Sequence, residues 1–200
     1  MVSHKHKIVF VHIPKTGGTS IEESLGGGDY FNSHDYLRFY KNNIKNFESY
    51  TSFSVVRNPF DKMVSEYFFF KKTHEQLNPV FKNCSFEEFL DIFFSINDPK
   101  FFKNTAPHWF KMHFETHRVS QLSFIRPQED LDFVVKFENI QSGYNIVCDH
   151  VGIESRKLPH LNSTRHKHYS EYYNDNTKQI VAEKYQEDLD YFGYKFENKN

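Results

Sequence analysis

Six consecutive residues near the N-terminus combine one cation, small residues and hydroxyl groups: Lys15, Thr16, Gly17, Gly18, Thr19 and Ser20. They follow a short apolar run, residues 8–13, that predicts a buried strand, and they precede residues 21–25, whose spacing predicts a helix. A strand, a turn of small residues and a helix present backbone N–H groups to an anion, and the lysine adds a full positive charge. The stretch therefore indicates an anion-binding loop, with an ordinary strand-to-helix turn as the structural alternative.

A second strand-to-helix junction carries an arginine and a serine. Residues 53–56 predict a strand that ends at Arg57, and Pro59 suits the first position of the helix that follows. Ser65 lies about two turns into this helix, so both side chains can face the same mouth of a sheet. A phosphate dianion requires a planar bidentate donor and a hydroxyl near a helix N-terminus. The structural alternatives are a surface salt bridge for Arg57 and an ordinary helix hydroxyl for Ser65.

Composition limits the class of protein. The 200 residues suit one domain, with residues 1–6 expected to form a mobile end. A net charge of −1 excludes the global basic field of a nucleic-acid binder. Two cysteines are too few for a disulfide framework or a zinc cluster, and the twelve histidines form no metal motif. We therefore expect no metal. We also see no signal peptide or membrane anchor, which leads us to expect a cytoplasmic protein.

The remaining pattern alternates strands with helices. We expect further strands at residues 122–125 and 132–138, with a short one near 30–31, and helices at 86–95 and 177–192. The high phenylalanine content, 23 residues, predicts a core built largely from phenylalanine. Alternating strands and helices indicate an α/β fold with a mainly parallel sheet.

The loop at residues 13–20 resembles that of a known family. It is similar to the 5′-phosphosulfate loop of sulfotransferases that use 3′-phosphoadenosine 5′-phosphosulfate (PAPS). The matching form is the one found in carbohydrate sulfotransferases of the heparan 2-O type and their bacterial family 2 relatives. Arg57, followed by Asn58 and Pro59 and eight residues later by Ser65, resembles the family's 3′-phosphate motif. Strings at 126–128, 158–163 and 183–194 are also similar, as are the tyrosines at 169, 172 and 173. The resemblance covers nearly the whole chain, and residues 75–117 match least.

The resemblance implies a P-loop-NTPase-like three-layer sandwich, with the central sheet flanked by helices. It also implies in-line sulfuryl transfer from PAPS to a hydroxyl acceptor, with a carbohydrate as the expected acceptor, 3′,5′-ADP as product and no metal. Residues 16–20 would hold the 5′-phosphate, and Lys15 would stabilise charge on the leaving group. Arg57 and Ser65 would bind the 3′-phosphate.

The family's catalytic base and its basic loop also have counterparts. In the heparan 2-O type a histidine between the two phosphate motifs serves as the base, and His34 matches it by position and context. Neutral imidazole suits proton removal near pH 7, and Asp35 is a weaker candidate. Arg165 and Lys167 fall where family members fold a basic loop over the nucleotide, which makes them further candidates for phosphate contacts; a solvated loop is the alternative.

Two other functions stay open. A P-loop kinase or nucleotide hydrolase would carry its lysine after the second glycine of the loop, whereas Lys15 precedes Gly17 and Gly18. A non-catalytic nucleotide-binding relative would keep the fold without the chemistry. The sequence does not indicate the oligomeric state.

Overall fold

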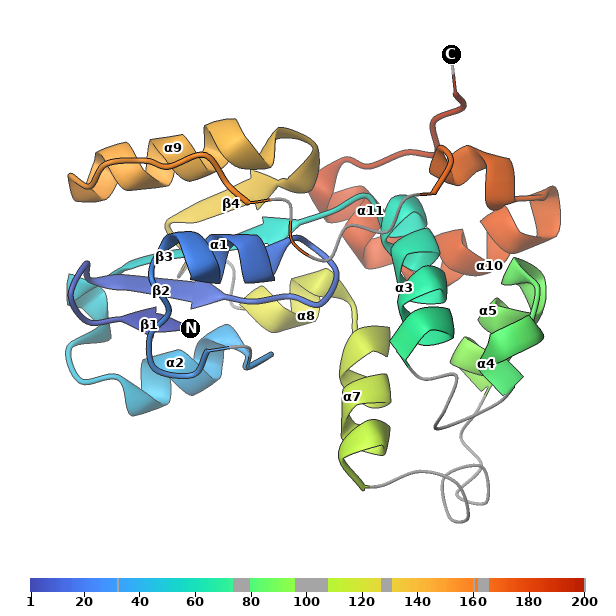
Figure 1. Ribbon diagram of the computed structural model, residues 1–200, viewed down its shortest axis with the longest axis horizontal. Coiled ribbons are helices and arrows are strands. Elements are labelled where there is room, and N and C mark those ends of the chain that lie inside the picture. Colours follow the sequence, from blue (N-terminus) through green and yellow to red (C-terminus); the bar gives the residue numbers. More distant parts are fainter. Residues whose placement is uncertain are drawn as a thin grey trace. The chain divides into compact units, whose positions relative to one another are not determined.

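The computed structural model describes residues 1–31, 33–73, 80–95, 108–126, 131–159, 161 and 166–199. The chain groups into two compact units, each built from two stretches of sequence (Figure 1). The first unit comprises Met1–Arg57 and Gln121–Ser163, and the second comprises Asn58–Ser120 and Thr164–Asn200. The expectation of one domain over residues 1–200 stays a prediction.

The first unit contains a four-stranded sheet in the order β1-β2-β3-β4. Its strands are β1 (Val2–Ser3), β2 (Ile8–Val11), β3 (Thr51–Val56) and β4 (Phe133–Lys136). The last three are parallel, and the register pairs Val11 with Ser54 and Val56 with Lys136. The carboxyl ends of three neighbouring strands therefore meet at one edge, which is where open α/β sheets bind ligands.

Helices cover both faces of this sheet, as Figure 1 shows: α1 (Gly18–Ser24) and α9 (Ile140–Val151) on one side, α2 (Leu37–Asn43) and α8 (Gln121–Ile125) on the other. Short 3-10 turns at Phe47–Ser49 and Phe137–Asn139 precede β3 and α9. The apolar side chains between the sheet, α1 and α9 form one cluster, which includes Phe10, Ile21, Phe53, Val55, Val135, Tyr144 and Val147. The predicted α/β fold, a mainly parallel sheet flanked by helices, is confirmed.

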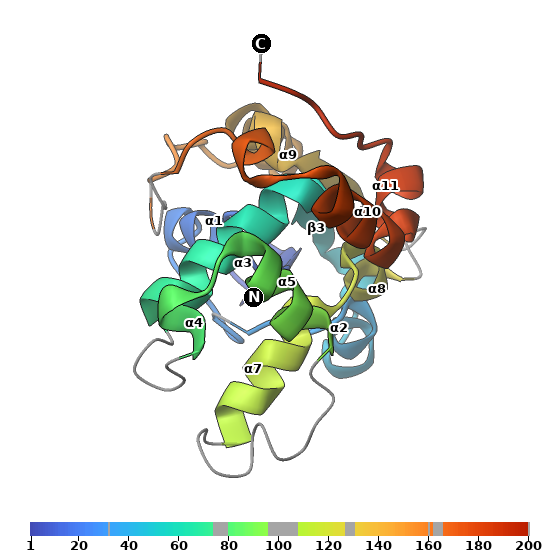
Figure 2. The same ribbon diagram turned by 90° about the vertical axis from the view of Figure 1, so that its right-hand side faces the viewer.

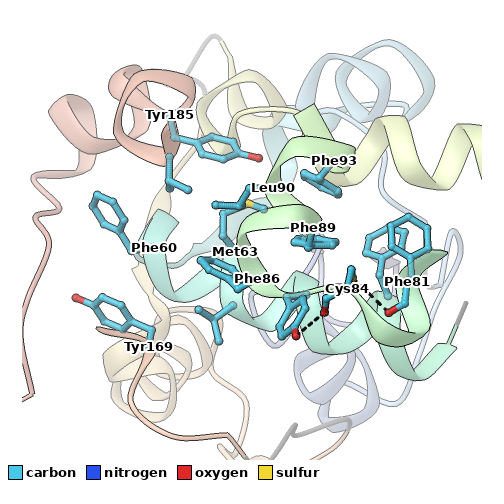
Figure 3. Packing of buried hydrophobic residues seen from close by; sticks show 14 of the residues in the cluster. Phe60, Met63, Phe81, Cys84, Phe86, Phe89, Leu90, Phe93, Tyr169 and Tyr185 are labelled. Carbon is cyan, nitrogen blue, oxygen red and sulfur yellow. Dashed lines mark hydrogen bonds between the residues drawn. The ribbon is translucent and has the colours of Figure 1, made fainter. Parts of the chain in front are cut away.

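The second unit is helical, with α3 (Pro59–Thr73), α4 (Val80–Asn83), α5 (Phe86–Ser95), α7 (His108–Arg118), the 3-10 turn Tyr169–Tyr172, α10 (Asp175–Lys184) and α11 (Gln186–Phe192). Figure 2 shows α3, α4 and α5 side by side. Their buried faces supply an aromatic core, and Figure 3 shows Phe81, Phe86, Phe89 and Phe93 within it. The expectation of a phenylalanine core is confirmed for this unit.

Four local expectations differ from the structure. Residues 122–125 belong to helix α8 rather than to a strand, and residues 177–192 form α10 and α11, which meet at Tyr185, rather than one helix. Near residues 30–31 the only sheet contact is a single bridge from Asp29 to Val2. Residues 1–3 are not a mobile end, because Met1 is fully buried and Val2 and Ser3 form an edge strand.

Among the described helices, none combines the length and the apolar character needed to cross a membrane.

Candidate active site

The turn after β2 has an unusual backbone conformation. Lys15 and Gly17 adopt left-handed conformations, with φ of 64° and 82°. For lysine this region is sparsely populated, and such conformations concentrate at functional sites. The Thr16 hydroxyl closes the turn by donating to the carbonyl oxygen of Ile13 at 2.9 Å. Thr16 is fully buried, so its side chain supports the loop from inside, while Thr19 is only half-buried at the start of α1.

Gly18 is required because the backbone passes directly over a histidine ring. A Cβ atom at position 18 would lie 2.1 Å from Cδ2 of His12, far inside van der Waals contact. His12 itself is 4% exposed and stacks on Phe10, with ring centroids 5.6 Å apart. The ring therefore has little room to move away from a side chain at this position.

We expect Gly18→Ala to lower the free energy of unfolding by about 1–3 kcal/mol, the usual effect of overpacking, and to weaken binding of 3′,5′-ADP. The matched control is Gly26→Ala, where no atom lies within 4 Å of the added Cβ and only the positive φ of 78° is strained. That strain costs about 1–2 kcal/mol and leaves binding unchanged. Urea denaturation and calorimetric titration measure both quantities. Wild-type binding by Gly18→Ala would show that the contact with His12 does not shape the loop.

Arg57 leaves the end of β3 and reaches the same turn. Its Nη1 donates to the carbonyl oxygen of Lys15 at 3.0 Å, and its guanidinium lies 4.3 Å from the centroid of the Phe137 ring. Gln121 holds the backbone of Arg57 in both directions, accepting from its N–H and donating to its carbonyl oxygen, each at 2.8 Å. The arginine is 8% exposed. The structure thus fixes a planar cation beside the lysine loop, a geometry suited to a phosphate group.

His34 is anchored on the same loop. Its Nδ1 lies 2.9 Å from the carbonyl oxygen of His12, and its ring meets the His12 ring edge-on at 4.5 Å. Because a carbonyl oxygen can only accept, Nδ1 of His34 carries the proton, and in the neutral ring the lone pair is on Nε2. This is the tautomer that a general base at Nε2 needs.

Two pairs of buried ionisable groups lie beside β2. Nδ1 of His12 is 3.2 Å from Oε1 of Glu22, a fully buried carboxylate on α1. The N-terminal ammonium of Met1 donates to the carbonyl oxygen of Phe10 at 2.9 Å and to the hydroxyl of Tyr40 at 2.7 Å. Burial lowers the pKa of this ammonium to about 6 and raises the pKa of Tyr40. The negative charge of Glu22 acts on both groups, raising each pKa.

The structure brings most of the predicted site residues together in the first unit: Lys15, Thr16, Gly17, Gly18, Thr19, Ser20, His34 and Arg57. Ser65 lies on α3 in the second unit and is 5% exposed. Lys167 is also in the second unit, exposed, with its Nζ 3.6 Å from Oε2 of Glu171. Arg165 lies outside the described residues. Phosphate contacts of Ser65, Arg165 and Lys167 stay predictions.

The sequence reasoning missed four residues that support the site: His12, Glu22, Gln121 and Phe137. Two of them left a signal. His12 is the polar break in an apolar strand, and Glu22 stands on the apolar stripe of its helix between Ile21 and Leu25. Polar residues at buried positions indicate a partner. Gln121 and Phe137 left no such signal, because their contacts join distant parts of the chain.

Across the described ranges, no three His, Cys, Asp or Glu side chains cluster as ligands of a metal ion would.

Comparison with known proteins identifies the family. A family model described as "Sulfotransferase family" matches residues 1–195. Among solved structures, a sulfotransferase from Alicyclobacillus acidocaldarius is similar, with a TM-score of 0.40 and 15% identity. The match covers 80% of this chain and 59% of that chain, so this protein spans less than two thirds of its length. Comparison with curated proteins gives no match. Because the family model covers almost the whole sequence, the chain belongs to the sulfotransferase family.

Proposed function

We propose that the protein transfers a sulfuryl group from PAPS to a hydroxyl group of an acceptor, with carbohydrates as the acceptor class. One observation carries this proposal: Lys15, Arg57 and His34 meet at the turn that follows β2. Arg57, at the end of β3, donates a hydrogen bond to the carbonyl oxygen of Lys15. His34, from the segment before α2, contacts the carbonyl oxygen of His12, three residues before Lys15. Two cations and a histidine of the correct tautomer are the groups that sulfuryl transfer to a hydroxyl needs.

The residues present fit a nucleotide that carries anionic groups at both ends. PAPS supplies the sulfuryl group on a phosphate leaving group and has a second phosphate at the 3′ position. The turn formed by residues 15–20 combines the Lys15 ammonium with a glycine backbone that allows close approach. Arg57 provides the planar donor for a phosphate. We assign the 5′-phosphosulfate to the turn and the 3′-phosphate to Arg57, while the contact of Ser65 with that phosphate stays a prediction from the sequence.

In this mechanism the chain positions the reactants and compensates charge, without a covalent enzyme intermediate. His34, held by its Nδ1–H, receives the acceptor's hydroxyl proton at Nε2 as the oxygen attacks sulfur. Lys15 stabilises the negative charge that develops on the oxygen of the leaving group. The backbone of residues 16–20 fixes the phosphate in line with the acceptor. The roles resemble those of phosphoryl transfer, where positioning and electrostatics dominate.

Ligand selectivity tests the proposal. A thermal-shift titration compares 3′,5′-ADP with ATP, and a ligand at about 100 times its dissociation constant adds about 2.7 kcal/mol of stability. We expect 3′,5′-ADP to stabilise the protein and ATP to stabilise it less. Stabilisation by ATP alone would favour a kinase or nucleotide hydrolase instead.

Turnover separates an enzyme from a non-catalytic relative. We expect release of 3′,5′-ADP from PAPS, and transfer of labelled sulfate, in the presence of a panel of glycans. Binding of 3′,5′-ADP without transfer to any hydroxyl acceptor would point to a nucleotide-binding relative. The carbohydrate class of the acceptor and a cytoplasmic location remain predictions from the sequence.

A further inference from the structure

Glu22 and His12 form a buried ionisable pair that the proposed mechanism does not use. Glu22 is fully buried and His12 is 4% exposed, and Nδ1 of His12 lies 3.2 Å from Oε1 of Glu22. Burying a carboxylate is costly unless it is paired, and such pairs often stabilise less than apolar residues of the same size. A contribution to stability alone therefore does not explain why Glu22 and His12 are buried together.

The pair is packed so that the His12 ring has one position. Phe10 stacks on the ring, with an interplanar angle of 26°. The backbone of Gly18 is so close that a Cβ atom there would lie 2.1 Å from the ring. Glu22 approaches Nδ1 from α1. Three sides of His12 are thus fixed by a strand, a loop and a helix.

His12 in turn holds His34 by two contacts. Its carbonyl oxygen accepts from Nδ1 of His34 at 2.9 Å, and its ring meets the His34 ring at 4.5 Å with an interplanar angle of 73°. A base whose ring is held at two points loses little orientation freedom when the acceptor binds. These contacts connect Glu22, on the buried side of α1, through His12 to His34, the proposed base.

We propose that Glu22 and His12 are positioning residues for His34, an inference that rests on the proposed role of His34 as the base. The pair fixes the orientation and tautomer of the His34 ring. The Met1 ammonium, Tyr40 and Asp35 are further ionisable groups near Glu22, and the carboxylates of Glu22 and Asp35 raise the pKa of the ammonium and of Tyr40.

The decisive variant is Glu22→Gln, with Glu23→Gln as the matched control, because Glu23 is the exposed neighbour on the same helix. Glutamine weakens the contact that fixes His12, so the His34 ring should be held less firmly. We expect kcat to fall on the order of tenfold, with KM for PAPS nearly unchanged. Glu23→Gln should reproduce the wild-type kcat and KM.

Nitrogen-15 NMR of the histidine rings provides a readout that does not need turnover. His34→Gln assigns the His34 signals, and the wild type should show the Nδ1–H tautomer. The fraction of His34 in that tautomer should fall in Glu22→Gln and stay constant in Glu23→Gln. If Glu22→Gln does not fold, the wild-type tautomer still tests the inference.

The outcomes separate this inference from the proposed function. A wild-type protein that does not use PAPS would contradict the proposed function, while the NMR experiment would still test the contacts to His34. An active wild type with His34 in the Nε2–H tautomer would overturn the inference. So would a Glu22→Gln variant whose kcat and His34 tautomer both match the wild type.

Discussion

Replacing Lys15 with glutamine should lower kcat on the order of 10²–10³-fold, a loss of about 2.7–4 kcal/mol of transition-state stabilisation. The reason is the charge that develops on the leaving oxygen as the bond to sulfur breaks. Glutamine keeps most of the side-chain length but has no charge to compensate it. The backbone contact from Arg57 to the carbonyl oxygen of residue 15 does not depend on the side chain. The loop should therefore keep its shape.

The matched control is Lys45→Gln, which removes an exposed lysine from the same unit. Its kcat, and its affinity for 3′,5′-ADP, should equal those of the wild type. In Lys15→Gln, KM for PAPS should change less than kcat, because the interaction strengthens in the transition state. A Lys15→Gln variant that retains wild-type kcat would remove Lys15 from the chemistry and leave it a role in binding alone.

The strand, turn and helix that carry the proposed phosphate site could be predicted because their signals are local. A strand, a turn of small residues and a helix follow one another at residues 8–25, and the structure places β2, the left-handed turn and α1 there. Pro59 begins α3 as its fixed backbone angle favours. The helix expected at residues 86–95 is also present as α5, and a capping box begins it, since Ser85 and Glu88 exchange hydrogen bonds of 2.7 Å and 3.1 Å.

The errors arise where tertiary contacts decide. Residues 122–125 are a short apolar run, which periodicity alone cannot assign to a strand or a helix. Packing favours the helix, because Leu122, Phe124 and Ile125 are all buried in it. The preceding Gln121 also accepts a hydrogen bond from the backbone N–H of Arg57. No pattern within residues 121–125 predicts this hydrogen bond, because Arg57 is 64 positions away in the sequence.

The proposed base is an intermediate case. The family resemblance indicates His34 by its position and context between two motifs, and no pattern around it predicts an orientation. The contact that orients it comes from His12, 22 residues earlier, whose own position depends on Glu22 and Gly18. The sequence could thus suggest which residue acts as the base, while the tautomer follows only from the fold.

His34→Asn tests the base most directly, because asparagine can keep the anchor and remove the reactive nitrogen. Its amide N–H₂ can donate to the carbonyl oxygen of His12, as Nδ1 of His34 does at 2.9 Å. It has no counterpart of Nε2. We expect kcat to fall about 10²–10⁴-fold, the usual contribution of general base catalysis, and the acidic limb of the pH profile to disappear.

The His34→Asn variant should bind 3′,5′-ADP and resist unfolding as the wild type does. Affinity for 3′,5′-ADP and the midpoint of urea denaturation should stay close to the wild type, since the variant keeps the loop contact. The matched control is His150→Asn, an exposed histidine on α9 in the same unit, which should retain full turnover. Undiminished turnover in His34→Asn would exclude His34 as the base. Asp35, the next residue, would then be the first group to replace, because a carboxylate can accept the same proton.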